Sequence, residues 1–204
     1  MLNIGRPVRL NRYNVSETCL HIYWKQGIKN ISYNDVIKTS KFAKGSFYKL
    51  FINEDDLQSE TLITYTRNND MNLLYYKLSN AEDLFQALNT HKNWKFNNNM
   101  NYCYFFIVYI EKYRAGVKTR KTISNIERKY KLLLSRITEK HIKKHNIKKS
   151  NINIKQVVNF IFNGLVLMNL FYRNKDSQDT INLYKKSLYQ FISYLNINKN
   201  HYKI

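Results

Sequence analysis

The chain has 204 residues, of which 44% are hydrophobic and 15% aromatic, so a packed core is expected and a disordered chain is excluded. One proline and five glycines leave little material for the turns of a strand-rich fold, so the composition predicts an all-α protein. The chain has 34 lysine and arginine residues and 14 acidic residues, a net charge of +20. This charge indicates a polyanionic partner such as nucleic acid. The alternative is that an A/T-rich coding sequence over-uses lysine, which would give the same excess of positive charge without any partner.

The chain begins with a basic segment, residues 1–13, which shows no apolar periodicity and lacks the apolar core of a signal peptide. A first helix is predicted over residues 15–26, because apolar side chains recur there at helical spacing and Gly27 is a natural stop. The arginines of the basic segment are Arg6, Arg9 and Arg12.

A short second helix is predicted over residues 33–40. Ser32 stands where an N-cap side chain is needed, and Asp35 suits the positive end of the helix dipole. A tight turn near residues 41–42 then leads into a third helix over residues 44–50.

A fourth helix is predicted over residues 54–65, where Asn53 caps the start and the first three helical residues are acidic. Two short helices joined by a tight turn, with a supporting helix on either side, are typical of a helix-turn-helix unit.

The rest of the chain is also expected to be helical, without internal repeats. Further helices are predicted over residues 81–88, 102–113, 122–144, 154–171 and 178–195, with a polar loop over residues 92–101.

The cysteines and the apolar stretches predict the cellular compartment of the protein. Cys19 and Cys103 lie among apolar and aromatic neighbours, which predicts buried free thiols in a reducing compartment rather than a disulfide. The longest apolar stretch, residues 157–171, is interrupted by asparagines and falls short of the ~20 residues that a membrane span needs. We therefore expect a soluble, cytoplasmic protein.

One segment carries a specific resemblance. The sequence HIYWKQGIKNISYNDVIKTSKFAKGSFYKLFINEDDL, residues 21–57, resembles the DNA-binding domain of the TetR family of bacterial transcriptional repressors, and GRPVR precedes it at residues 5–9. The residues that match the family pattern in order are Ile22, Tyr23, Gly27, Ser32, Asp35, Val36, Lys44, Gly45, Ser46, Phe47, Tyr48, Phe51, Asp55, Asp56 and Leu57.

Two positions depart from the pattern. The turn glycine of the family is Lys41 here, and lysine in a left-handed conformation costs roughly 1 kcal/mol relative to glycine. The lysine that helps to hold DNA phosphate in the family is Glu54.

The resemblance implies that residues 44–50 form a recognition helix in the major groove. Gly45 would let the helix approach closely, Lys44 would donate to a guanine or a phosphate, and Ser46 would meet a base edge. Phe47 would press on a thymine methyl or turn into the core. The alternative is an amphipathic connector whose lysines are merely solvated. The predicted DNA-binding residues are Ser32, Tyr33, Lys44, Gly45, Ser46, Phe47, Tyr48 and Lys49.

Residues 1–58 are thus expected to form the basic arm and DNA-binding domain, and residues 59–204 a helical domain for ligand binding and dimerisation. The last two helices carry apolar stripes that suit a four-helix dimer interface or the inside of one monomer. The predicted interface residues are Val158, Ile161, Phe162, Leu165, Tyr184, Leu188 and Phe191.

The middle helices are rich in aromatic residues, which would line a pocket for a small apolar or aromatic effector or form plain core. The candidate pocket residues are Trp94, Phe96, Phe105, Phe106, Tyr109 and Tyr113. His141 and His145 are four residues apart, but the lysines around them predict a solvated basic face rather than a metal site. No cofactor is expected.

The resulting hypothesis is a dimeric, sequence-specific regulator of transcription. It would bind a palindromic operator in double-stranded DNA as a repressor, and a small molecule would release it from the DNA. The chain has no Gly-rich phosphate loop and no nucleophile arrangement at motif spacing, so an enzyme is not expected. The alternative is a basic protein that coats DNA without reading its sequence.

Overall fold

The computed structural model describes residues 11–92, 100, 102–149 and 152–197 of the chain. Every regular element among these residues is helical, as the composition predicts. The elements are α1 (Arg12–Gln26), α2 (Tyr33–Ser40), α3 (Lys44–Leu50), α4 (Glu54–Arg67), α5 (Asn69–Ser79), α6 (Leu84–Lys92), α7 (Tyr104–Ile110), η2 (Lys112–Arg114), α8 (Val117–Lys144), α9 (Ile154–Asn174) and α10 (Gln178–Ile197).

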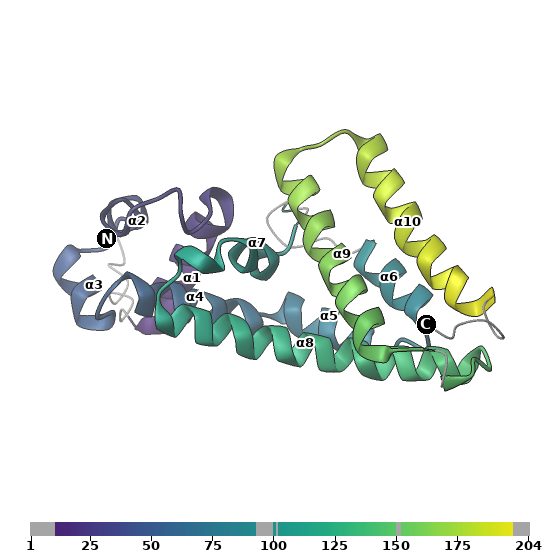
Figure 1. The fold of residues 1–204 in the computed structure, drawn as a ribbon. Coiled ribbons are helices and arrows are strands. Elements are labelled where there is room, and N and C mark those ends of the chain that lie inside the picture. Colours follow the sequence, from purple (N-terminus) through teal and green to yellow (C-terminus); the bar gives the residue numbers. More distant parts are fainter. Residues whose placement is uncertain (1–10, 93–99, 101, 150–151, 198–204) are drawn as a thin grey trace, which may run out of the picture.

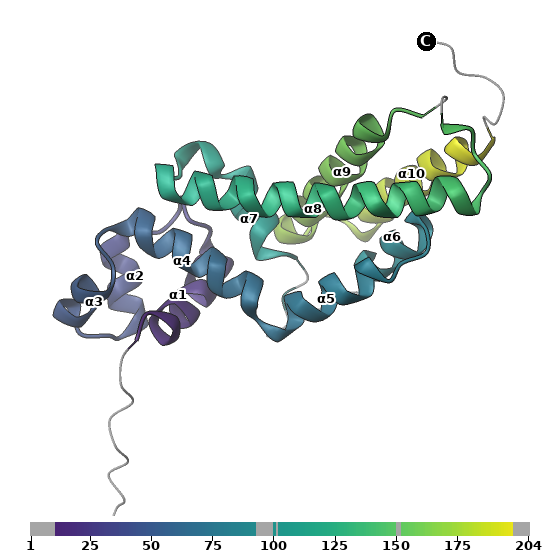
Figure 2. The same cartoon turned by 90° about the horizontal axis from the view of Figure 1, so that it is seen from below.

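The molecule is elongated, with α1, α2 and α3 at one end and α6, α9 and α10 at the other (Figures 1 and 2). Helix α4 packs against both α1 and α8, and α8 in turn packs against α9. A continuous buried core runs from Val15 in α1 to Ile192 in α10. The two ends are therefore joined by packed helices, and α4 runs without a break through residue 58, where the sequence divided the chain.

The predicted caps at the end of α1 and at the starts of α2 and α4 are present. The Ser32 side chain accepts a hydrogen bond from the Asp35 N–H, and the Asn53 side chain accepts one from the Asp56 N–H. Gly27 ends α1 with φ of 85°, and Lys41 ends α2 in the left-handed conformation with φ of 59°. Short-range capping chemistry thus sets these boundaries.

Three predictions for the following helices need correction. Helix α5 was not predicted, because the Asn-rich start that resembles a loop in fact contains its cap: the Asn68 side chain accepts from the Met71 N–H. The single helix predicted over residues 102–113 ends at Ile110 and continues as the short η2. Helix α8 begins at Val117, before the predicted residue 122, because a side chain from α4 caps it.

Cys19 and Cys103 are free and buried, as predicted. Helix α9 is long and apolar enough to cross a membrane by length and composition, but half of its most apolar window is buried inside the protein. Core helices of soluble proteins have the same properties.

The two histidines near the end of α8 do not lie on a solvated face. His141 is fully buried, and Asp83, which lies just before α6, places a carboxylate oxygen 3.5 Å from His145 Nε2. The sequence suggested no acid nearby because Asp83 is remote from this pair along the chain and only the fold brings them together.

Candidate nucleic-acid interface

Helices α2 and α3 form a compact pair around one aromatic side chain. The Phe47 ring is fully buried, with its centroid 5.8 Å from that of Tyr33 and 5.6 Å from that of Phe51. Phe42 in the turn packs against the same ring at 6.5 Å. The packing of these aromatic rings fixes the angle at which α3 leaves the turn.

The position of Phe47 settles one of the two roles considered for it. A side chain with 0% exposure has no surface to offer a thymine methyl, so Phe47 is a core residue and not a DNA contact. The aromatic positions of the motif are explained by packing within the helix pair.

The start of α3, by contrast, points away from the protein. Lys44 and Gly45 are exposed, Ser46 is half-buried, and no side chain caps this helix end. A Cβ atom placed on Gly45 would meet no heavy atom of the described residues within 4 Å, so packing among those residues does not require a glycine there.

Tyr48 and Lys49 extend the same exposed surface along α3. The Tyr48 side chain is 46% exposed, its ring centroid lies 5.8 Å from that of Tyr33, and its hydroxyl donates to Asn34 Oδ1 at 3.5 Å at an exposed position. Lys49 is exposed, and the Lys44 ammonium lies 5.9 Å from the Tyr48 ring. Cationic and phenolic groups of this kind bind phosphate oxygens.

At the start of α2, the exposed Ser32 and the half-buried Tyr33 lie beside this surface. Burial raises the pKa of Tyr33 to about 12, so its hydroxyl stays neutral, and it lies 3.5 Å from the Phe51 carbonyl oxygen, to which it donates. The Ser32 hydroxyl donates a hydrogen bond to the Asp35 carboxylate at 2.6 Å. Both residues lie near the exposed start of α3, but their hydroxyl groups bond to other parts of the protein.

The basic segment before α1 is only partly described. Arg6 and Arg9 lie outside the described residues. Arg12 binds the Asp56 and Glu60 carboxylates at 2.9 and 3.1 Å, and its guanidinium lies 4.6 Å from the Phe51 ring. Arg12 therefore joins α1 to α4 and is not free to bind DNA.

Glu54, which replaces a phosphate-binding lysine of the resembled family, is half-buried at the start of α4. It accepts a hydrogen bond from the Gln58 side chain at 3.1 Å, and burial raises its pKa. This residue stabilises α4 and offers no positive charge to a phosphate.

Two polar contacts join the α1–α4 region to the remaining helices. The Asp55 carboxylate accepts from the backbone N–H groups of Lys118 and Thr119 at 2.8 Å, which caps α8 from α4. On the other side, Glu111 binds Arg173 at 2.8 Å and accepts from the Lys29 N–H at 3.2 Å. A movement of α8 or α9 would therefore also move α4 and the end of α1.

The aromatic residues predicted for an effector pocket differ in their surroundings. Phe105 and Phe106 are buried core, Tyr109 packs on Phe162 with ring centroids 5.3 Å apart, and Tyr113 is 84% exposed. Trp94 and Phe96 lie outside the described residues.

A cavity of about 510 Å³ lies between α4, α5 and α8, and another of about 680 Å³ lies between the end of α1, α7 and α9. Sequence periodicity could not find them because their linings mix polar and apolar side chains and come from helices that are distant along the chain. The residues of the first cavity are Ile63, Thr66, Arg67, Tyr75, Thr122, Asn125, Ile126 and Lys129.

Most of the residues predicted for a dimer interface are buried within the chain, so they cannot contact a second copy. A Cβ atom on Gly164 would lie 2.5 Å from Leu188 Cδ2, so this glycine serves the packing of α9 on α10. Tyr184 and Phe191 are half-buried. The buried residues are Val158, Ile161, Phe162, Leu165 and Leu188.

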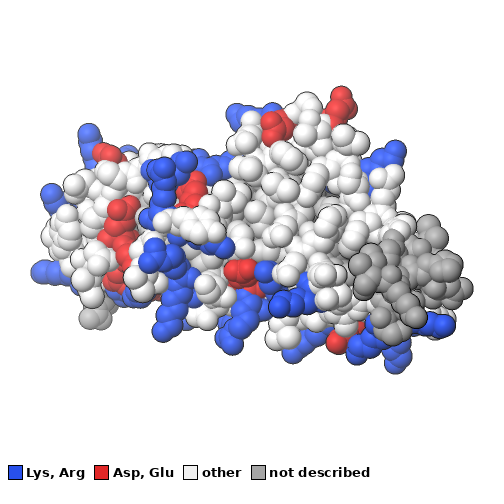
Figure 3. All heavy atoms as spheres, in the orientation of Figure 1, with Lys and Arg blue, Asp and Glu red and all other residues white. Residues whose placement is uncertain are grey.

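Positive charge is not confined to α2 and α3. Figure 3 shows lysine and arginine side chains on much of one face, densest in its left half and along its lower edge, with a smaller number of acidic side chains among them. Long-range attraction of a polyanion would therefore act on the entire molecule.

No family model and no curated protein sequence matches the chain. Its fold is similar to that of a TetR family transcriptional regulator from Cytophaga hutchinsonii, with a TM-score of 0.73 and 16% identity over 90% of this chain and 93% of that chain. It is also similar to reduced NemR from E. coli, with a TM-score of 0.69 and 16% identity over 88% and 95% of the two chains.

A third similar structure is a cysteine mutant of the TetR family regulator CifR complexed with 26bp double-strand operator DNA. The TM-score is 0.67 and the identity 12%, over 95% of this chain and 99% of that chain. These neighbours are TetR-family transcriptional regulators, and the chain shares their all-helical fold along nearly its whole length.

Proposed function

We propose that this chain is a TetR-family regulator of transcription: a cytoplasmic homodimer that binds a palindromic DNA operator in a sequence-specific way and acts as a repressor. The observation that carries the proposal is the start of α3, where Gly45 faces open space between an exposed lysine and a half-buried serine. The CifR structure, which shares the fold, contains operator DNA, and this supports the same use of the fold here.

Within this proposal, residues 1–58 read DNA and residues 59–204 bind an effector and the second copy. Gly45 lets the backbone of α3 come close to the bases, while Lys44 and Ser46 meet base edges. Tyr48 and Lys49 bind phosphates and fix the position of the helix on the duplex.

An effector would act through the contacts that hold α4 against α8. The cavity of about 510 Å³ is lined by α4 and α8 together, with apolar side chains such as Ile63 and Ile126 and polar ones such as Asn125. A small molecule that enters it would change the separation of the two helices. Since Asp55 ties α4 to the start of α8, this change would alter the spacing of the two recognition helices in a dimer.

The proposed dimer uses the outer faces of α9 and α10 rather than the buried stripes. Phe160 and Leu167 on α9 are 45% and 41% exposed, and Leu183 and Tyr194 on α10 are 68% and 48% exposed. Apolar side chains that recur at helical spacing on two adjacent helices are typical of a surface that a partner covers.

The double variant Leu167→Glu with Leu183→Glu is expected to convert the dimer into a folded monomer, because it places charges in the centre of this apolar surface. Light scattering gives the mass, and circular dichroism checks the fold. The matched control is Leu132→Glu, which changes another exposed leucine, 54% exposed on α8, and should remain dimeric. A double variant that stays dimeric would place the interface elsewhere.

The spread of positive charge in Figure 3 favours a second candidate, a protein that coats DNA without reading it. Selection of bound duplexes from a random pool at about 150 mM salt separates the two, because purely electrostatic binding is weak there. A palindromic consensus supports the regulator. A pool that shows no enrichment, with or without added cell extract as a source of effector, supports the coating protein.

The division of roles along α3 has its own test on the selected duplex. Replacing Lys44 and Ser46 by alanine should relax the base preference by about 1–3 kcal/mol at the contacted positions. Replacing Tyr48 and Lys49 by alanine should weaken binding to all duplexes equally. If both pairs changed preference and affinity in the same way, the assignment of base and phosphate contacts would be wrong.

A further inference from the structure

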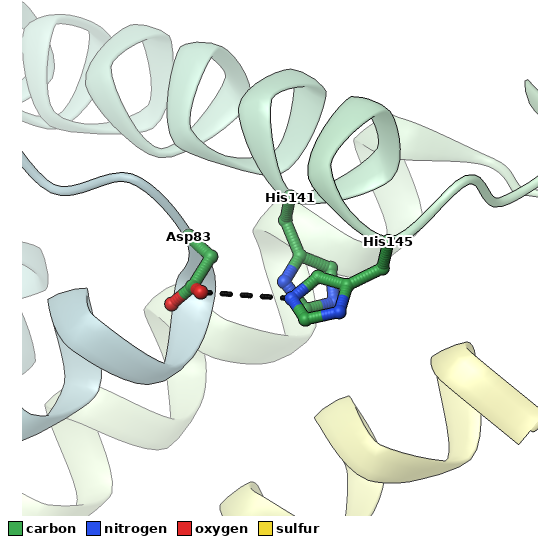
Figure 4. Close-up of side chains that lie close together, drawn as sticks. All are labelled: Asp83, His141 and His145. Carbon is green, nitrogen blue, oxygen red and sulfur yellow. Dashed lines mark ion pairs between the residues drawn. The ribbon is translucent and has the colours of Figure 1, made fainter.

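Three potential metal ligands meet at the end of the molecule opposite α3 (Figure 4). Asp83 lies just before α6, His141 lies in the last turns of α8, and His145 is the residue at which α8 ends. One ligand atom from each lies within 4.8 Å of the other two, and Asp83 Oδ2 is 3.5 Å from His145 Nε2. The spacing of four residues brings the two imidazoles to the same face of α8, as in helical metal sites.

The environment of His141 is unusual for a structural histidine. Its side chain is 0% exposed, and neither ring nitrogen has a hydrogen bond of normal geometry among the described residues, with Asn196 as the nearby polar side chain. A buried polar group without a partner is destabilising, and a neutral ring nitrogen is the form that binds metal ions.

The neighbouring side chains hold the three ligands in place. The Phe85 ring lies 5.7 Å from His141 and 6.3 Å from His145, and so packs against both imidazoles. Lys144 donates to Asp83 at 2.9 Å and to Glu82 at 2.9 Å. Lys144 is 45% exposed, so it can release Asp83 and keep Glu82 when a cation takes its place.

We propose that Asp83, His141 and His145 form a binding site for a divalent transition-metal ion, with Zn²⁺ as the best fit. Two imidazoles and one carboxylate match the ligands of Zn²⁺, at about 2.0–2.2 Å, whereas Mg²⁺ and Ca²⁺ prefer oxygen ligands alone. The ligand atoms, which lie within 4.8 Å of one another, need to approach by up to about 1.4 Å to reach the spacing of a tetrahedral site.

The fourth position of the ion has a candidate ligand on α10. The Asn196 side-chain oxygen is buried and has no hydrogen bond of normal geometry among the described residues, and Asn196 lies beside His141. Asn196 or a water molecule would complete a tetrahedral set. The ion would then join α6, α8 and α10, and so stabilise this end of the protein.

Titration of the chelator-treated protein with Co²⁺, followed by visible absorption, tests the proposal. One equivalent per chain is expected to give the d–d bands of a tetrahedral site, and Zn²⁺ should displace it and raise the melting temperature. Asp83→Asn and His145→Ala should each weaken Co²⁺ binding tenfold or more. These two side chains are less buried than His141, so both variants are expected to fold.

The matched control is Glu82→Gln, which removes the adjacent carboxylate that shares Lys144 but lies outside the cluster, and it should bind Co²⁺ like the wild type. Lys144→Met should bind more tightly, because it removes the cation that competes for Asp83. Absence of stoichiometric binding would overturn the proposal. So would wild-type affinity in both the Asp83 and the His145 variants, which would place the ion on other histidines.

Discussion

Helices α3 and α9 each contain a glycine, but the two glycines have opposite surroundings. A Cβ atom on Gly164 in α9 would lie 2.5 Å from Leu188, whereas one on Gly45 in α3 would meet nothing within 4 Å. A glycine inside a helix costs roughly 0.5–1 kcal/mol relative to alanine. Close helix packing accounts for that cost in α9. No contact within the described chain accounts for it in α3, so the reason is best sought in a partner that approaches α3 closely.

The same contrast holds for the two regions as wholes. The α2–α3 pair has a small aromatic core around Phe47 and an outer surface of lysine, serine and tyrosine. The α9–α10 pair is apolar on the inside, around Leu165 and Leu188, and also partly apolar on the outside, at Leu167 and Leu183. A polar exposed helix start suits DNA, and an apolar exposed face suits a second copy of the chain.

The largest effect expected within this comparison is that of Gly164→Val. The added side chain collides with Leu188, so the free energy of unfolding should fall by about 1–3 kcal/mol in urea titrations. The control is the exposed neighbour Asn163→Ala, which should change stability by less than about 0.5 kcal/mol. A Gly164→Val protein as stable as the wild type would remove the packing explanation.

A smaller effect is expected at Asp56, where α1, α4 and α8 meet between the α2–α3 pair and the α9–α10 pair. Hydrogen bonding to Arg12, opposed by burial and aided by Lys118 and the Ile52 N–H, holds the pKa of Asp56 well below its usual range. Asp56→Asn should lower the free energy of unfolding at pH 7 by about 1 kcal/mol, because the carboxylate loses its charge-assisted bonds.

The pH dependence of this loss has a definite sign. The folded-state pKa of Asp56 is depressed, so its contribution is complete above about pH 5 and declines as the pH falls toward the folded-state value. Between pH 7 and about pH 3 the wild type should therefore lose more stability than Asp56→Asn does. Glu60→Gln, which removes a more exposed partner of Arg12, is the control and should behave nearly like the wild type. Equal acid sensitivity in Asp56→Asn and the wild type would contradict the role given to Asp56.

The first four helices could be predicted because the signals are local. Ser32, Asn53 and Gly27 act on the residues next to them, so the caps predict the boundaries. Sequence periodicity also shows which residues of α9 face inward, but it does not show whether they face the same chain or another. The metal-ligand cluster was missed for a related reason, since Asp83 meets His145 only through tertiary packing.

The smallest effect on the fold and the most direct test of the account come from Gly45→Ala. Because the new methyl group meets nothing and alanine favours helices, the free energy of unfolding should stay the same or rise by up to about 1 kcal/mol. The measurement is the affinity for the selected duplex, compared with a scrambled duplex and with wild-type protein at the same salt. The account predicts at least about a tenfold loss of affinity for the selected duplex without any loss of stability. An unchanged affinity would show that α3 does not approach DNA closely, and would contradict the central claim.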